Sequence, residues 1–231
     1  MKIWDINPGY LGRQQLLTEH TELHSLAQVI ESQLDGVGKM NSAVLRWAYH
    51  PAAVALRHAI VVEEMKMRDI EHKTPIAVPS TACEWPALEG DWTAATQYAE
   101  LADKGVAGRI PLPMSSVQLW EQHAYSVMAR DLPLFKELQS QVESKAIAFD
   151  ELADLLVETL RRPCHQHHWD KVVMGMWEPC LAASEAFDYR SSFGRPDRLL
   201  RGIQYLSAQY QWPELWQATA LTELACAVRV N

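Results

Sequence analysis

The sequence of 231 residues predicts an all-α fold, and three features support this prediction. Apolar residues recur at steps of three and four through most of the chain, which is the spacing of one face of a helix. Almost no stretch alternates between apolar and polar residues with period two, as a half-buried strand does. Prolines and small polar residues stand where the periodic segments begin, which is typical of helix starts.

Three helices are expected in the first third of the chain, after a short extended start at residues 1–7. The first runs from about 8 to 34 and ends at the glycine-containing stretch Asp35–Gly38. A short helix follows from about 41 to 50, and Pro51 begins a third that continues to about residue 69. One face of the first helix is a stripe of apolar or ring-bearing side chains, namely Leu16, His20, Leu23, Ala27, Ile30 and Leu34.

The remaining helices are predicted from similar signals, with Asp91, Ser115 or Ser116, and Asp150 as capping residues. Their expected ranges are about 91–104, 115–130, 131–145, 151–161, 163–177, 179–189 and 196–210, with a last helix from Pro213 that carries Trp216, Ala220 and Leu224 on one face. Prolines at 75, 79 and 86 mark a loop, and those at 111 and 113 require extended backbone. We therefore predict a helical unit over 1–78, a proline-containing linker with one helix over 79–114, and a helical domain over 115–231.

Composition limits the classes of function. The net charge of −8 counts against nucleic acid as a partner, although residues 1–78 are nearly balanced with 8 Lys/Arg and 9 Asp/Glu. No run of 18 apolar residues exists, so we expect no membrane span, and the start of the chain lacks the apolar segment of a signal peptide. Four cysteines lie far apart, which favours reduced thiols in a cytoplasmic protein. The sequence leaves the oligomeric state open.

Residues 1–78 resemble the pyrimidine-dimer DNA glycosylase family, also called the endonuclease V type. The resemblance rests on Met1–Ile3, on the segment Gln14–Leu23, and on the later helix from Leu56 to Arg68. Farther along, Leu119–Asp131 is similar to a helical domain family of unknown function, which adds fold information but no chemistry. The resemblance implies damaged double-stranded DNA as the substrate and DNA repair as the role.

The resemblance also implies a mechanism and its residues. In the family, the amino-terminal α-amine attacks the sugar C1′ of a damaged nucleotide, an imine forms, the base leaves, and β-elimination breaks the strand. The amine here is that of Met1, and the catalytic glutamate of the family falls on Glu22. An α-amine has a pKa near 8, so more of it is free base at neutral pH than of a lysine. Contacts to phosphate or base are expected from Lys2, which keeps a positive charge where the family has an arginine. They are also expected from Arg13, Arg57 and His58, because of their charge and their place in the resembling segments.

The sequence departs from the family at positions where the family has DNA-contacting residues. Thr21 stands where the family has an arginine, and Gln15 stands where it has a histidine. A second hypothesis is therefore a non-catalytic helical binding protein that kept the scaffold and lost the activity.

A third hypothesis is a metal-binding protein, although the glycosylase chemistry itself calls for no metal and no cofactor. His20 and His24 lie four residues apart and so on one side of a helix, as in helical zinc sites. The densest group of ligand-type residues elsewhere consists of Cys164, His165, His167 and His168. The order His-Thr-Glu-Leu-His differs from the His-Glu-x-x-His of metalloproteases.

Overall fold

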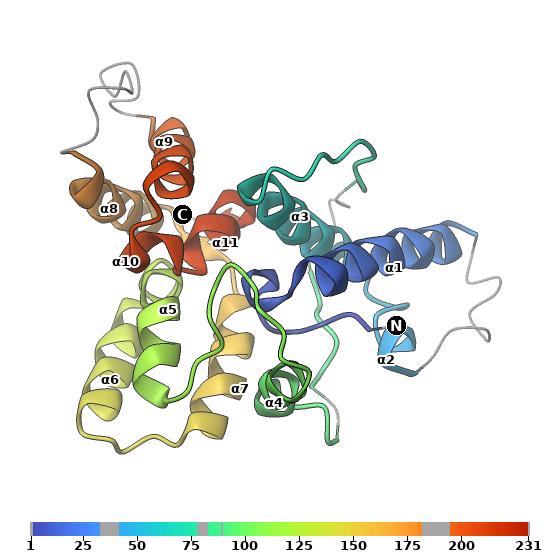
Figure 1. Ribbon diagram of the computed structural model, residues 1–231, viewed down its shortest axis with the longest axis horizontal. Helices are drawn as coiled ribbons and strands as arrows, with labels where there is room; N and C mark the ends of the chain where they lie inside the picture. Colours follow the sequence, from blue (N-terminus) through green and yellow to red (C-terminus); the bar gives the residue numbers. More distant parts are fainter. Residues whose placement is uncertain (1, 33–41, 78–82, 89, 182–194, 231) are drawn as a thin grey trace. The chain divides into compact units, whose positions relative to one another are not determined.

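The computed structural model describes residues 2–32, 42–77, 83–88, 90–181 and 195–230, and it confirms the all-α prediction (Figure 1). Within these residues the extended structure assigned to strands amounts to two short segments, β1 (Cys164–His165) and β2 (Arg229–Val230). The two strands pair in parallel, Cys164 with Arg229 and His165 with Val230. Among the described helices, none is long and apolar enough to cross a membrane.

The chain divides into two units, Met1–Gly108 and Arg109–Asn231. The division lies inside the range 79–114 for which the sequence predicts a linker. Each unit is described by itself below.

The described residues of unit 1 form a 3-10 turn and four helices. They are η1 (Pro8–Tyr10), α1 (Arg13–Glu31), α2 (Ser42–Leu45), α3 (Pro51–Met67) and α4 (Ala94–Asp103). Helices α1 and α3 pack side by side (Figure 1). Both helices carry buried apolar side chains, among them Leu16, Leu23 and Leu26 of α1 and Val61 and Met65 of α3. This pair of helices is the frame on which the candidate site is built.

The single helix predicted from residue 8 to 34 is wrong, because the segment is divided near Gly12. Pro8 opens only the turn η1, where the Asn7 side chain accepts a hydrogen bond of 2.7 Å from Gly9 N. Gly12 is extended, with ψ at 166°, and α1 begins after it. Helix α1 ends at Glu31, and the expected stop at Asp35–Gly38 lies outside the described residues.

Helix α4 also begins later than predicted. Its cap is Thr93, whose hydroxyl accepts a hydrogen bond from Thr96 N, and Asp91 precedes it in a turn that follows Gly90. The predicted stop at Gly105 is confirmed, because this glycine has a φ of +60°, which favours a residue without Cβ.

Unit 2 is a helical bundle around α5. Its helices, within the residues that the structure describes, are α5 (Ser116–Met128), α6 (Leu132–Glu143), α7 (Phe149–Leu160), α8 (Gln166–Trp177), α9 (Pro196–Tyr210), α10 (Pro213–Trp216) and α11 (Ala220–Cys226). Helix α5 contacts α6, α7, α8 and α11, and the buried Trp169 of α8 donates to the carbonyl oxygen of Leu224. The helix predicted at 179–189 lies mostly outside the described residues. The helix predicted at 163–177 begins only at Gln166, because Cys164 and His165 are extended and pair with β2.

Two further sequence predictions for unit 2 are wrong in detail. Asp150 is not a cap, because α7 already begins at Phe149; its carboxylate lies in the first turn, where negative charge is favourable. The last helix is broken, because Thr219 donates both its backbone N–H and its hydroxyl to the carbonyl oxygen of Gln122, at 2.9 and 3.1 Å. The chain therefore restarts as α11 instead of continuing α10.

Candidate active site on helix α1

The amino-terminal segment of unit 1 is held through its backbone by side chains from three helices. Trp4 N donates to Oε1 of Glu19 on α1 at 3.1 Å. The amide oxygen of Gln97, on α4, accepts from Asp5 N at 2.8 Å and from Ile6 N at 3.4 Å. These bonds satisfy backbone groups that have no partner within a helix or sheet, and they fix the start of the chain against α1.

Arginines of α3 and its C-terminal end hold the next residues of the same segment. Arg57 donates from Nη1 to the carbonyl oxygen of Ile6 at 2.8 Å. Arg68 donates to three carbonyl oxygens around the η1 turn, and Glu64 holds the Arg68 guanidinium at 2.7 Å. The segment from Trp4 to Leu11 is thus bound at both ends.

Glu19 and Arg57 form a buried ion pair between α1 and α3. Nε and Nη2 of Arg57 lie 2.8 and 3.0 Å from the two carboxylate oxygens of Glu19, a bidentate arrangement. Burial raises the pKa of Glu19 above its ordinary value, while the Arg57 guanidinium and the N–H of Trp4 act in the opposite direction. The pair therefore fixes the position of α3 and of the amino-terminal segment relative to α1.

Glu22 lies three residues after Glu19 on the same side of α1, and its side chain is 7% exposed. Among the described residues no hydrogen bond or ion pair is formed by its carboxylate. A nearly buried carboxylate with unused hydrogen-bonding capacity can accept or deliver a proton to a bound molecule. Met1, the other residue predicted to be catalytic, lies outside the described residues.

The residues predicted to bind substrate have different surroundings. Lys2 forms an ion pair with Glu100 of α4, and its ammonium lies 4.1 Å from the ring centre of Trp92. Arg13 is exposed at the start of α1. Arg57 is 4% exposed and committed to Glu19 and Ile6, so its placement suits a positioning role better than a phosphate contact.

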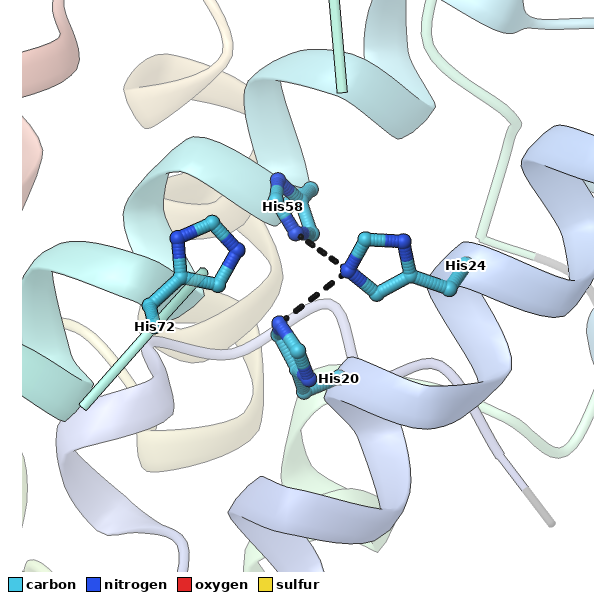
Figure 2. Close-up of side chains that lie close together, drawn as sticks. All are labelled: His20, His24, His58 and His72. Atoms are coloured by element: carbon cyan, nitrogen blue, oxygen red, sulfur yellow. Dashed lines mark hydrogen bonds between the residues drawn. The ribbon is translucent and has the colours of Figure 1, made fainter. Parts of the chain in front are cut away.

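His58 belongs to a cluster of four histidines at the contact of α1 with α3. Figure 2 shows His20 and His24 on α1, His58 on α3, and His72 on the segment that follows α3. Nε2 of His24 lies 3.3 Å from Nε2 of His20 and 3.1 Å from Nε2 of His58. One ring nitrogen from each of the four histidines lies within 4.8 Å of the others.

Burial lowers the pKa of three members of this cluster. The pKa of His20 falls to about 4 and that of His58 to about 3, in each case through burial first and neighbouring histidines second. The pKa of His24 is lowered for the same reasons. These three imidazoles are therefore neutral at pH 7, the form in which histidine binds metals.

The second group predicted to hold a metal is not brought together. Cys164 is buried on β1, where its N–H bonds to the carbonyl oxygen of Val228, and its thiol does not converge with the ring nitrogens of His165, His167 and His168. In the described part of the chain, the histidines of unit 1 are the sole set of three or more such residues whose ligand atoms converge.

Several residues that shape the site were not predicted from the sequence. Gln97 and Arg46 hold Asp5, and His72 completes the histidine cluster. Gln97 lies 92 residues from Asp5, and His72 stands in a segment without periodicity, so no local pattern indicates either. Arg68 belongs to a segment that resembles the family, but the resemblance does not indicate that its side chain binds the η1 turn.

Comparison with known proteins gives one match in the region of this site. The model of a family described as pyrimidine dimer DNA glycosylase matches residues 1–78. A search of curated proteins and a search of solved structures each found no match. The matched residues comprise α1 to α3 and the amino-terminal segment, and α4 completes unit 1 beyond the match.

Proposed function

We propose that unit 1, whose residues 1–78 match the pyrimidine dimer DNA glycosylase family, excises damaged bases from double-stranded DNA and then cleaves the abasic strand. The nucleophile is the α-amine of Met1, and Glu22 is the catalytic carboxylate. The amine nitrogen bonds to C1′ of the damaged nucleotide as the bond from C1′ to the base breaks, and the base leaves with that electron pair and takes up a proton.

The following steps use the same two groups. The sugar ring opens to give an imine between C1′ and the amine. Removal of a C2′ proton then expels the 3′ phosphate by β-elimination, and water releases the sugar and restores the amine. Glu22 moves protons in these steps and stabilises the positive charge that develops on the sugar.

The observation that carries the proposal is the attachment of the amino-terminal segment beside Glu22. Trp4 N bonds to Glu19, which precedes Glu22 by three residues on one face of α1. Glu22 follows Glu19 by less than one turn of the helix, about 4.5 Å along its axis. The residues that follow the proposed nucleophile are thus held beside the turn of α1 that carries the proposed carboxylate.

The roles of the other residues follow from their contacts. Arg57 positions the segment by holding both Glu19 and the carbonyl oxygen of Ile6. Lys2 and Arg13 contact phosphate, and Lys2 does so once DNA has displaced it from Glu100. His58 acts indirectly, because it is 3% exposed and faces the other histidines.

A second candidate function is that of a non-catalytic helical binding protein, and the charge pairing in unit 1 favours it. Most described cations of this unit are held by carboxylates: Lys2 and Lys104 by Glu100, Arg46 by Asp5, Arg57 by Glu19, Lys66 by Glu63 and Arg68 by Glu64. Paired cations contribute less to phosphate binding than free ones. The two functions differ in whether a covalent intermediate forms.

Reductive trapping tests the proposal. Untagged protein is mixed at low salt with duplex DNA that carries a cyclobutane pyrimidine dimer, or an abasic site, and borohydride reduces any imine to a stable amine. We expect a covalent adduct that maps to the Met1 amine and is absent when this amine is acetylated. Glu22→Gln should lower turnover about 10²- to 10⁴-fold, the range for loss of a positioned acid–base group.

Two matched variants make the result specific. Glu31→Gln changes an exposed carboxylate on the same helix and should leave turnover unchanged. Lys2→Met removes the neighbouring amine and should weaken DNA binding without removing the adduct. Absence of an adduct on both DNAs would refute the proposal and favour the binding protein, and an adduct on Lys2 would refute the assignment of the amine.

A further inference from the structure

We infer that His20, His24, His58 and His72 bind one divalent transition-metal ion, and that zinc is the ion that this set suits. The site is separate from the amine–carboxylate chemistry, because Met1 and Glu22 are not among its ligands. All four ligands lie in unit 1, on α1, on α3 and on the segment after α3 (Figure 2).

The spacing of the nitrogen atoms fits a tetrahedral site. Zinc binds histidine nitrogen at about 2.0–2.1 Å, so the nitrogens of a tetrahedron around it are about 3.3–3.4 Å apart. The distances from His24 Nε2 to the Nε2 atoms of His20 and His58 are 3.3 and 3.1 Å. All four ligand nitrogens lie within 4.8 Å of one another. The largest of these distances exceeds the tetrahedral N–N distance by no more than about 1.4 Å, and rotation of the imidazole rings can close this difference.

Hydrogen bonding among the four rings does not account for this arrangement. A ring nitrogen of a neutral histidine carries either one hydrogen or one lone pair. His24 Nε2 has two nitrogen neighbours, so it cannot form a well-directed hydrogen bond with both. Nε2 of His72 is buried and has no hydrogen-bond partner in the described part of the protein. A cation among the four nitrogens would satisfy every lone pair at once.

The chemistry of the ligands selects the metal. Four imidazoles suit zinc, copper, iron and nickel, whereas magnesium and calcium require oxygen ligands. The lowered pKa values of His20, His24 and His58 mean that no proton has to be displaced from these ligands at pH 7. Copper(II) and nickel(II) prefer tetragonal geometry, while zinc accepts the tetrahedral one.

A shell of four protein ligands leaves no open position, which is the form of a structural site. The ion would join α1 to α3 and to the segment that carries His72. Among the described hydrogen bonds, none connects His72 to α1. The expected effect is thus on stability: zinc should raise the melting temperature of the protein and protect residues near His72 from proteolysis.

Metal binding by untagged, chelator-treated protein tests the inference. We expect one zinc ion per chain by elemental analysis and calorimetry, and the intense visible absorption of tetrahedral cobalt when Co²⁺ replaces zinc. His24→Ala and His72→Ala should each weaken zinc binding by more than about 100-fold, beyond the 10- to 100-fold cost of losing an outer-shell partner. Both residues are only partly buried, so these variants avoid the cavity that His58→Ala would leave.

Control variants separate this site from other histidines and from catalysis. His50→Ala, whose ring contacts the carbonyl oxygen of Glu84, should bind zinc normally, and so should Glu22→Gln. Circular dichroism of the metal-free variants establishes that they fold. The inference is refuted by zinc binding weaker than about 100 µM, by cobalt spectra of octahedral type, or by binding that disappears in a His165/His167/His168 triple alanine variant and persists in His24→Ala.

Discussion

Replacing Arg57 by methionine should destabilise unit 1 strongly. The guanidinium makes two hydrogen bonds to the fully buried Glu19 and one to the carbonyl oxygen of Ile6. Methionine fills much of the same volume but leaves a buried carboxylate and a carbonyl group without this partner. Removing one member of a buried ion pair costs about 3–5 kcal/mol, and we expect Arg57→Met to lower the free energy of unfolding by this amount at pH 7.

The same variant should acquire a distinctive pH dependence. Burial already raises the pKa of Glu19, and without Arg57 the main opposing influence is lost. Folded Glu19 then binds a proton at pH values where the unfolded carboxyl, with a pKa of about 4.3, has lost it. Stability therefore falls as pH rises above that value, so the difference from the unmodified protein should be smaller at pH 5 than at pH 8.

Urea denaturation followed by circular dichroism measures both effects. Lys66→Met is the matched control. It also breaks an ion pair, that of Lys66 with Glu63 at 2.7 Å, but the Lys66 side chain is 56% exposed. The control should cost no more than about 1 kcal/mol. The double variant Glu19→Gln/Arg57→Met should lose less than the two single losses added together. A cost for Arg57→Met as small as that of the control would refute the reasoning.

Three further changes test other parts of the structure. Gly108→Ala should lower stability by about 1–3 kcal/mol in thermal melts, because its Cβ would overlap the backbone oxygen of Gly9 in the η1 turn. Gly175→Ala is the control: it has open space around its Cβ and should be neutral or stabilising. Asp131→Ala should cost about 1 kcal/mol in urea denaturation, because the carboxylate caps α6 with a hydrogen bond of 2.9 Å; Asp131→Asn should retain most of the stability. In the presence of a chelator, stability should fall as the pH is lowered from about 6.5 towards 4. In the folded protein His20 and His58 have pKa values of about 4 and 3 and stay neutral, whereas in the unfolded chain they take up protons over this range. A urea midpoint that does not change between these pH values would contradict the structure.

Local signals in the sequence predicted most helix starts in the chain. Pro51, Ser115 and Asp131 each stand at or just before the first turn of α3, α5 and α6, where a fixed φ or a side-chain acceptor acts within three residues. The predicted course of the last helix failed because Thr219 bonds to Gln122, a residue far away in sequence. Tertiary hydrogen bonds of this kind override local preference.

The candidate site could likewise be predicted only where local sequence signals indicate its residues. Glu22 could be found from the resemblance, and the pairing of His20 with His24 from helical spacing. That Arg57 lies buried against Glu19, and that His58 and His72 join the α1 histidines, depends on how α1 and α3 pack. The periodic stripe on the first helix predicts that one of its faces is buried, but it does not identify the residues of other segments that lie against that face.

The attachment of the amino-terminal segment has a consequence for how the protein is made. Trp4, Asp5 and Ile6 are held by residues that lie between 15 and 92 positions farther along the chain. At about 5–20 residues per second, the ribosome needs roughly 5–20 s to add the 90 or so residues up to α4. During this interval residues 4–6 lack part of the set of side chains that holds them in the folded unit. Their attachment is therefore completed only after α4 has been synthesised.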